Sequence, residues 1–173
     1  MYTCLRRGSY FLVSFSVGRW TKETCREMIA RVKDCLEGGK TTFYSDGNDD
    51  YLYVLLEYFE DIDYGQIVKK RENGRVVGKE KRALIGNPFM NGIETFNVEN
   101  FNSILRNFLS RLVRKGKGFT KKAPRLHDAI ALFQFIWNFI HKLKCKKTPA
   151  MIEGLAVKLW TWKKLLTYHY ATD

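Results

Sequence analysis

The chain has 173 residues, of which 45% are hydrophobic and 14% aromatic. This composition can fill one sizeable core, and it excludes collagen-like, mucin-like and wholly disordered chains. The formal net charge of +12 is too large for an ordinary metabolic enzyme and indicates a polyanionic partner, with nucleic acid as the first candidate.

The charge is uneven along the chain. Residues 1–64 carry eight basic and eleven acidic side chains, whereas residues 65–173 carry 22 and seven. We therefore expect the partner surface in the second half.

The cysteines and the apolar runs indicate a cytoplasmic protein. Four cysteines lie far apart without a CxxC pair, which favours free thiols over a zinc ribbon or a disulfide framework. The longest apolar run, 129–140, is shorter than the ~20 residues of a membrane span, and the first residues do not form a signal peptide. We expect no membrane partner.

The first third of the chain predicts a hairpin, a helix and a third strand. Strands are expected at 2–5 and 10–17. Thr21 is placed to cap a helix that ends at Gly38-Gly39. A strand at 41–45 follows at once, and this strand, helix, strand order predicts a parallel pair joined by a crossover helix.

The middle of the chain predicts a helix at 51–59, packed on that sheet, and then a β-ribbon. Two extended runs, 66–70 and 75–84, flank Asn73-Gly74, which is a hairpin turn signal. The ribbon is rich in Lys and Arg, so we expect it to be exposed.

Helices dominate the last part. Apolar residues recur at helical spacing over 97–115 and 124–143. A basic tail, 144–173, closes with a short helix at 161–168. We therefore expect an α/β domain over 1–143, followed by the tail.

Three residues are candidates for chemistry. Asp46 directly follows a strand, at the sheet edge where open α/β sheets place functional groups. Glu99 and Arg106 share the polar face of the 97–115 helix, because seven residues make about two turns. On the pattern alone, a turn aspartate and a solvated Glu–Arg pair are the alternative interpretation, and both stay open.

Short motifs occur in a fixed order between about residues 1 and 166. They are Phe43-Tyr44-Ser45-Asp46-Gly47, Val98-Glu99-Asn100-Phe101-Asn102-Ser103-Ile104-Leu105-Arg106, Leu109-Ser110-Arg111-Leu112-Val113-Arg114-Lys115, Gly118-Phe119-Thr120-Lys121-Lys122, Asn138-Phe139, Thr148-Pro149-Ala150-Met151 and Trp160-Thr161-Trp162-Lys163-Lys164-Leu165-Leu166. This ordered set resembles the DDE transposases of the IS1 type, which move insertion sequences by nicking and transferring DNA strands.

The resemblance implies a ribonuclease-H-like fold, a mixed sheet with flanking helices. It also implies roles for three residues: Asp46 as the second acidic metal ligand, Glu99 as the third, and Arg106 as the basic residue that accompanies Glu99. The cofactor implied is Mg²⁺ or Mn²⁺. Glu94 begins a similar Glu-Thr-Phe-Asn run but lacks the basic residue seven positions on, where Phe101 stands.

One departure from the family concerns the first catalytic aspartate, which these enzymes carry on a strand ahead of the hairpin. The sequence begins at that hairpin, so we expect an amino-terminally truncated fold with its first strand missing. An unpaired edge should then lie beside strand 10–17 or strand 41–45. Because a carboxylate bridging two metal ions fixes their spacing, we expect a weak metal site and little strand transfer.

The stretch 111–122 is the candidate DNA-binding surface. It holds six basic residues and no acid, a composition suited to a phosphate backbone: Arg111, Arg114, Lys115, Lys117, Lys121 and Lys122. A solubilising helix end is the alternative. The partners expected are double-stranded DNA at transposon ends, a second copy and a full-length transposase, in a prokaryotic nucleoid.

Two further readings of the function stay open. The chain could be a non-catalytic DNA-binding protein, or an inhibitory partner of a full-length transposase. A membrane-surface role for the basic helix at 124–147 ranks third, because its apolar stripe is needed for the core.

His141 and Cys145 are spaced like metal ligands but have no partner pair, and His127 suits packing or phosphate contact.

Overall fold

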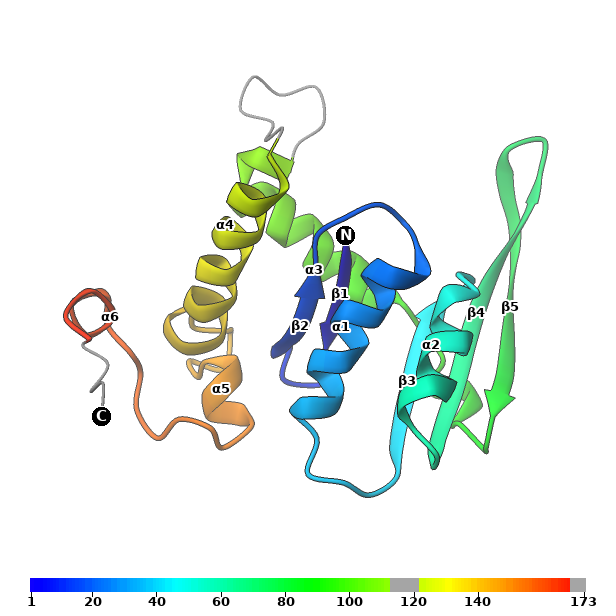
Figure 1. Ribbon diagram of the computed structural model, residues 1–173, viewed down its shortest axis with the longest axis horizontal. Helices are drawn as coiled ribbons and strands as arrows, with labels where there is room; N and C mark the ends of the chain where they lie inside the picture. Colours follow the sequence, from blue (N-terminus) through cyan, green and yellow to red (C-terminus); the bar gives the residue numbers. More distant parts are fainter. Residues whose placement is uncertain (113–121, 169–173) are drawn as a thin grey trace.

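The computed structural model describes residues 1–112 and 122–168 (Figure 1). The strands are β1 (Tyr2–Leu5), β2 (Leu12–Ser16), β3 (Thr41–Asp46), β4 (Ile62–Glu72) and β5 (Arg75–Ile85). The α-helices are α1 (Lys22–Asp34), α2 (Asp50–Tyr58), α3 (Phe96–Phe108), α4 (Ala123–Phe135), α5 (Pro149–Ile152) and α6 (Trp162–Leu166). Two 3₁₀ turns, η1 (Met90–Gly92) and η2 (Ser110–Leu112), and a π-helical turn, η3 (Ile136–Ile140), complete the described elements.

The strands form two separate sheets. β1 and β2 make the predicted antiparallel hairpin, and β3, β4 and β5 make a mixed sheet in that order. The expected parallel pairing of strand 41–45 with the first hairpin is wrong, because β3 pairs with β4 instead, across α2. β4 extends back to Ile62, and its buried first half supplies the neighbour that β3 needs. The α/β class is confirmed, with a three-stranded mixed sheet and flanking helices.

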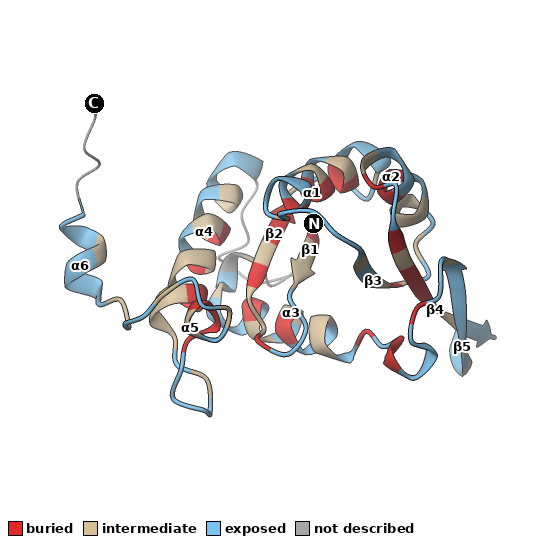
Figure 2. Cartoon of the chain, turned by 90° about the horizontal axis from the view of Figure 1, so that it is seen from below, coloured by how far each residue is buried: buried red, intermediate tan, exposed pale blue. Residues whose placement is uncertain are grey.

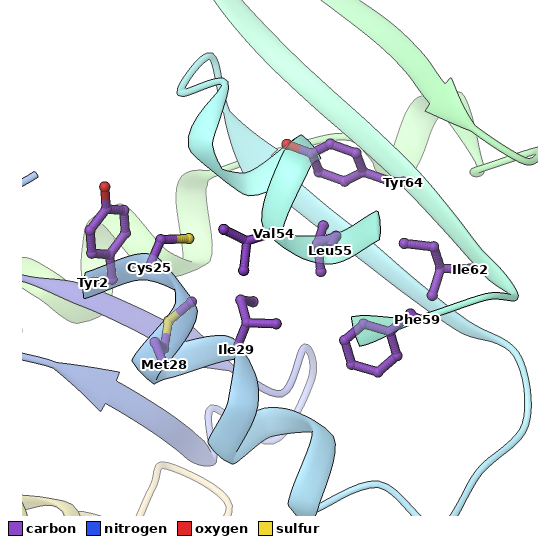
Figure 3. Close-up of a cluster of buried hydrophobic side chains, with 9 residues drawn as sticks. All are labelled: Tyr2, Cys25, Met28, Ile29, Val54, Leu55, Phe59, Ile62 and Tyr64. Atoms are coloured by element: carbon purple, nitrogen blue, oxygen red, sulfur yellow. The ribbon is translucent and has the colours of Figure 1, made fainter. Parts of the chain in front are cut away.

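Helices α1 and α2 cover one side of the sheets and enclose the first core (Figures 2 and 3). Its buried side chains are Tyr2, Cys25, Met28, Ile29, Val54, Leu55, Phe59, Ile62 and Tyr64. The predicted cap of α1 is present, since the Thr21 hydroxyl accepts a hydrogen bond from the Thr24 amide at 3.4 Å. Through this core, α1 packs against both the hairpin and the helix and strand of the three-stranded sheet region, α2 and β4.

Helix α3 lies on the other side of the molecule from α1 and α2 (Figure 2). Its buried Phe101 and Leu105 contact Leu12 of the hairpin and Phe133 and Trp137 of α4 and η3. The helix therefore packs on the hairpin and on α4. Aromatic contacts contribute to this packing, since the ring of Phe101 lies 6.1 Å from that of Phe133 and 5.2 Å from that of Trp137.

Helix α3 also ends earlier than the predicted Lys115. Leu109 adopts an extended conformation, with φ −113° and ψ 91°, and the 3₁₀ turn η2 follows. The predicted 124–143 helix is α4, which continues as the π-helical turn η3 up to Ile140.

The π-helical turn brings a side-chain amide to the outer edge of the hairpin. The Leu12 amide donates to Asn138 Oδ1 at 2.9 Å, and Asn138 Nδ2 donates to the Leu12 carbonyl at 3.0 Å. Gln134 Nε2 donates to the same carbonyl at 2.8 Å. The edge of β2 is thus covered by side chains, which protects it from pairing with another strand.

The segment after residue 143 contributes to the same body. Thr148, Pro149 and Ala150 are fully buried beside η3, and Thr148 caps α5. The four cysteines are free, as expected. Among the described helices, none combines the length and the apolar character that crossing a bilayer requires.

Candidate active site

A cavity of about 350 Å³ separates β1 from β3. Both strands line it along their length, α1 lines it with apolar side chains, and the start of α3 lines it with polar ones. Figure 2 shows α1 and α3 on opposite sides of β1 and β3. The gap expected beside the third strand is therefore present, and it faces β1.

Asp46 lies at the carboxyl end of β3, as predicted, and lines this cavity. Its carboxylate accepts a hydrogen bond from the Asn48 amide at 3.4 Å, which orients the turn that leads into α2. The neighbouring Ser45 is buried, and its hydroxyl lies 2.6 Å from that of Tyr64. The carboxylate thus stands on a strand end that is fixed by buried contacts.

The Asp46 carboxylate affects two tyrosines, the partly buried Tyr51 and the buried Tyr64. Burial raises the pKa of Tyr51, and the Asp46 carboxylate raises it further. Burial likewise raises the pKa of Tyr64 to about 12, with Asp46 as a smaller cause. Both phenols remain protonated at neutral pH, so they can donate hydrogen bonds but cannot act as bases.

Glu99 lines the same cavity from the first turn of α3. Lys69 of β4 donates to Glu99 Oε1 at 2.7 Å, and the Thr95 hydroxyl donates to the same oxygen at 3.3 Å. The Lys69 hydrogen bond is the main cause that lowers the pKa of Glu99. Glu99 is therefore an anion at neutral pH, and its side chain is half exposed.

The structure brings Asp46 and Glu99 to one cavity but leaves Arg106 outside it. Arg106 is exposed on α3, and it is not one of the residues that line the cavity. Glu94 does line it, with its carboxylate 3.9 Å from Arg7. Within residues 1–112 and 122–168, no three acidic, His or Cys side chains gather closely enough to hold a metal ion.

Beside Glu99 lies a set of three lysines that the sequence pattern did not reveal as a unit. Lys69 stands directly opposite Lys79 across the β4–β5 ladder, and Lys81 is two residues further along the same face. We call Lys69, Lys79 and Lys81 the lysine ladder. Lys79 also helps to lower the pKa of Glu99, so the ladder and the carboxylate share one electrostatic environment.

The opposite face of the ribbon is different. There, Glu80 pairs with Lys70 at 3.3 Å and with Arg82 at 2.9 Å. These contacts, Arg82 first, lower the pKa of Glu80 to about 2. On one face of the ribbon, one carboxylate therefore lies between two cations, whereas the ladder face places Lys69 directly opposite Lys79, which is unfavourable without an anionic partner.

The predicted DNA-binding stretch falls mostly outside the described residues. Arg114, Lys115, Lys117 and Lys121 are not described, nor is the side chain of Arg111; Lys122 is exposed just before α4. The expected exposure of the basic ribbon is confirmed for most of the 75–84 run, whereas Gln66 and Ile67 at the start of the 66–70 run are buried.

The remaining aromatic and histidine candidates are packing residues in the structure. His141 stacks on Trp137 with ring centroids 4.7 Å apart, and His127 lies 5.1 Å from the ring of Phe15. Cys145 is exposed. Trp137 is a core residue, while Trp160 packs on Phe135 at the edge of the body.

No protein-family model matches this chain, and neither a curated protein nor a solved structure gives a match.

Proposed function

We propose that this chain is a DNA-binding domain of the IS1-type DDE transposase class, with a ribonuclease-H-like fold. Its duplex DNA lies along the lysine ladder, and a divalent ion, Mg²⁺ or Mn²⁺, binds between Asp46 and Glu99. The observation that carries the proposal is that these two carboxylates line one cavity directly beside the ladder. Such an arrangement serves phosphoryl transfer, in which metal ions stabilise the attacking and leaving oxygens.

The pairing of Lys69 with Glu99 supports this arrangement. Without DNA, the lysine neutralises the carboxylate at 2.7 Å. A phosphate arriving on the ladder offers Lys69 a second anion, which frees Glu99 for a hydrated cation. Mg²⁺ is bound through one or two carboxylates plus substrate phosphates in many sites, so DNA and metal are expected to bind together.

A second function is favoured by a specific observation. Because Lys69 already pairs with Glu99 at 2.7 Å, the carboxylate has a partner without metal, and a non-catalytic role is the alternative proposal. In that role the protein binds transposon ends in the nucleoid, or joins a full-length transposase in a mixed oligomer and inhibits it. Metal-dependent DNA nicking separates the two functions.

Neutralising the ladder should weaken the binding of duplex DNA. In the Lys79→Gln, Lys81→Gln variant, two phosphate contacts are lost. Each contact contributes about −0.9 to the slope of log K against log salt, so the slope should become less negative by about 1.8. Fluorescence anisotropy with a labelled duplex over a salt series measures this directly.

The matched control is the Lys70→Gln, Arg82→Gln variant, which removes two positive charges from the other face of the same ribbon. Its slope should stay close to that of the native protein. If both variants make the slope less negative by the same amount, the ribbon acts only through its net charge, and the ladder is not the DNA-binding surface.

A further inference from the structure

The strand edges differ in whether other groups cover or protect them. The outer edge of β2 is covered by the amides of Gln134 and Asn138. The outer edge of β5 carries exposed charged side chains, a common protection against pairing. By contrast, in the described residues β1 pairs only with β2, and β3 only with β4. Two unprotected edges therefore face each other across the cavity.

Polar contacts near both ends of β1 link it to segments on the other side of the cavity. At one end, the Tyr2 hydroxyl donates to Asp50 Oδ2 at 3.0 Å. At the other, Arg7 donates to the Gly92 carbonyl at 2.5 Å and lies over the ring of Tyr44. β1 thus begins near the end of β3, so the two strands run in opposite directions. A strand inserted between them would be parallel to one and antiparallel to the other, and both pairings are allowed.

The two walls of the cavity match the two faces of a strand. On the α1 side, the lining is apolar and consists of Met28, Ile29, Val32 and Leu36. On the α3 side, it is polar, with Thr95, Asn97 and Asn102 and the carboxylates of Glu94 and Glu99 among its residues. Side chains alternate between the faces of a strand, so an amphipathic strand would satisfy both walls at once.

We propose that this cavity binds an extended peptide by β-strand addition. The ligand is an amphipathic strand with apolar side chains toward α1 and polar side chains toward α3. Its backbone hydrogen-bonds to β1 and β3 and joins the two sheets into one. Asp46 and Glu99 line the same cavity, but the backbone contacts of the peptide require neither carboxylate, so peptide binding is measured without metal or DNA.

Hydrogen exchange of the native protein with a synthetic peptide tests this site. The probe is a peptide of about eight residues in which valine and threonine alternate, with a lysine at each end. At a free concentration of about 100 times its Kd, it should slow amide exchange about 100-fold in β1 and β3. Exchange in β5 should not change. The same peptide N-methylated at alternate residues, which removes hydrogen-bond donors, should have no effect.

A pair of leucine variants tests the apolar wall. Leu36→Asp places a charge in the lining, and should weaken peptide binding about tenfold or more, as expected for the loss of one buried leucine contact. Leu56→Asp is the control, because Leu56 is exposed on α2 and is not a lining residue.

Three results would overturn the proposal. The first is an absence of protection in β1 and β3 at saturating peptide. The second is equal protection in β5, which would show indiscriminate strand pairing. The third is protection of β1 and β3 without peptide that grows with protein concentration, which would assign the cavity to a second copy of the chain.

Discussion

Supplying a further carboxylate beside Asp46 and Glu99 should turn the protein into a DNA-nicking enzyme. Met1 lines the cavity, so a strand of about eight residues fused ahead of it through an Asn-Gly turn can fold back along β1. One aspartate on the face toward α3 would then join Asp46 and Glu99. Three carboxylates can hold the two metal ions that DNA strand cleavage uses. Conversion of supercoiled plasmid to nicked circles in Mn²⁺ measures the result.

The matched control for this fusion carries asparagine in place of the added aspartate. It should leave the plasmid intact, as should the aspartate fusion combined with Asp46→Asn or with Glu99→Gln. Nicking by the unmodified chain that Glu99→Gln abolishes would contradict the account. It would mean that a third ligand is already present and that the unmodified site is complete.

Removing the ring of Phe101 should cause the largest loss of stability. Phe101 is fully buried, 5.2 Å from the ring of Trp137 and 6.1 Å from that of Phe133. Phe101→Ala leaves a cavity where α3, α4 and the hairpin meet, and such changes cost about 3–5 kcal/mol. Because domains are stable by only about 5–15 kcal/mol, much of the protein should unfold. Urea denaturation followed by circular dichroism measures the free energy of unfolding.

Phe96→Ala provides the control on the same helix. Phe96 begins α3 and is 67% exposed, so its loss should change the free energy of unfolding by no more than about 0.5 kcal/mol. Equal losses in the two variants would show that α3 is not held by the aromatic contacts of Phe101.

The sequence correctly predicted turns and helix ends whose conformation depends on residues close together in the chain. Asn73 and Gly74 both adopt positive φ, 48° and 78°, as a tight hairpin turn requires. Thr21 caps α1 as its position suggests. In both cases, the residues that decide the conformation are neighbours in the chain, so their pattern is sufficient.

Long-range choices could not be predicted in the same way. The apolar stripe of α3 fits either the sheet or α4, and only the packed structure distinguishes them. The partner of β3 likewise depends on Ile62 and Tyr64, which begin β4 before the run that the sequence pattern marks as extended.

The site shows the same division. Asp46 and Glu99 could be identified from their motifs, whereas the lysine ladder depends on an irregularity in the ribbon. A regular two-residue hairpin at Asn73-Gly74 would pair Lys69 with Gly78. The register shift between Lys70 and Arg71 pairs it with Lys79 instead. One extra residue therefore brings Lys69 and Lys79 together, and no periodicity in the sequence predicts this register shift.

We propose that Asp46 and Glu99 share one divalent ion when DNA is bound, and a titration with Mn²⁺ is the test. Mn²⁺ broadens nuclear magnetic resonance signals close to it, so a titration of the isotope-labelled protein with duplex DNA locates the ion. The amide signals of Asp46 and Glu99 should broaden together, and the Asp46→Asn, Glu99→Gln variant should lose the effect. Broadening centred on Glu80 or Asp128, with the Asp46 and Glu99 signals unchanged, would contradict it.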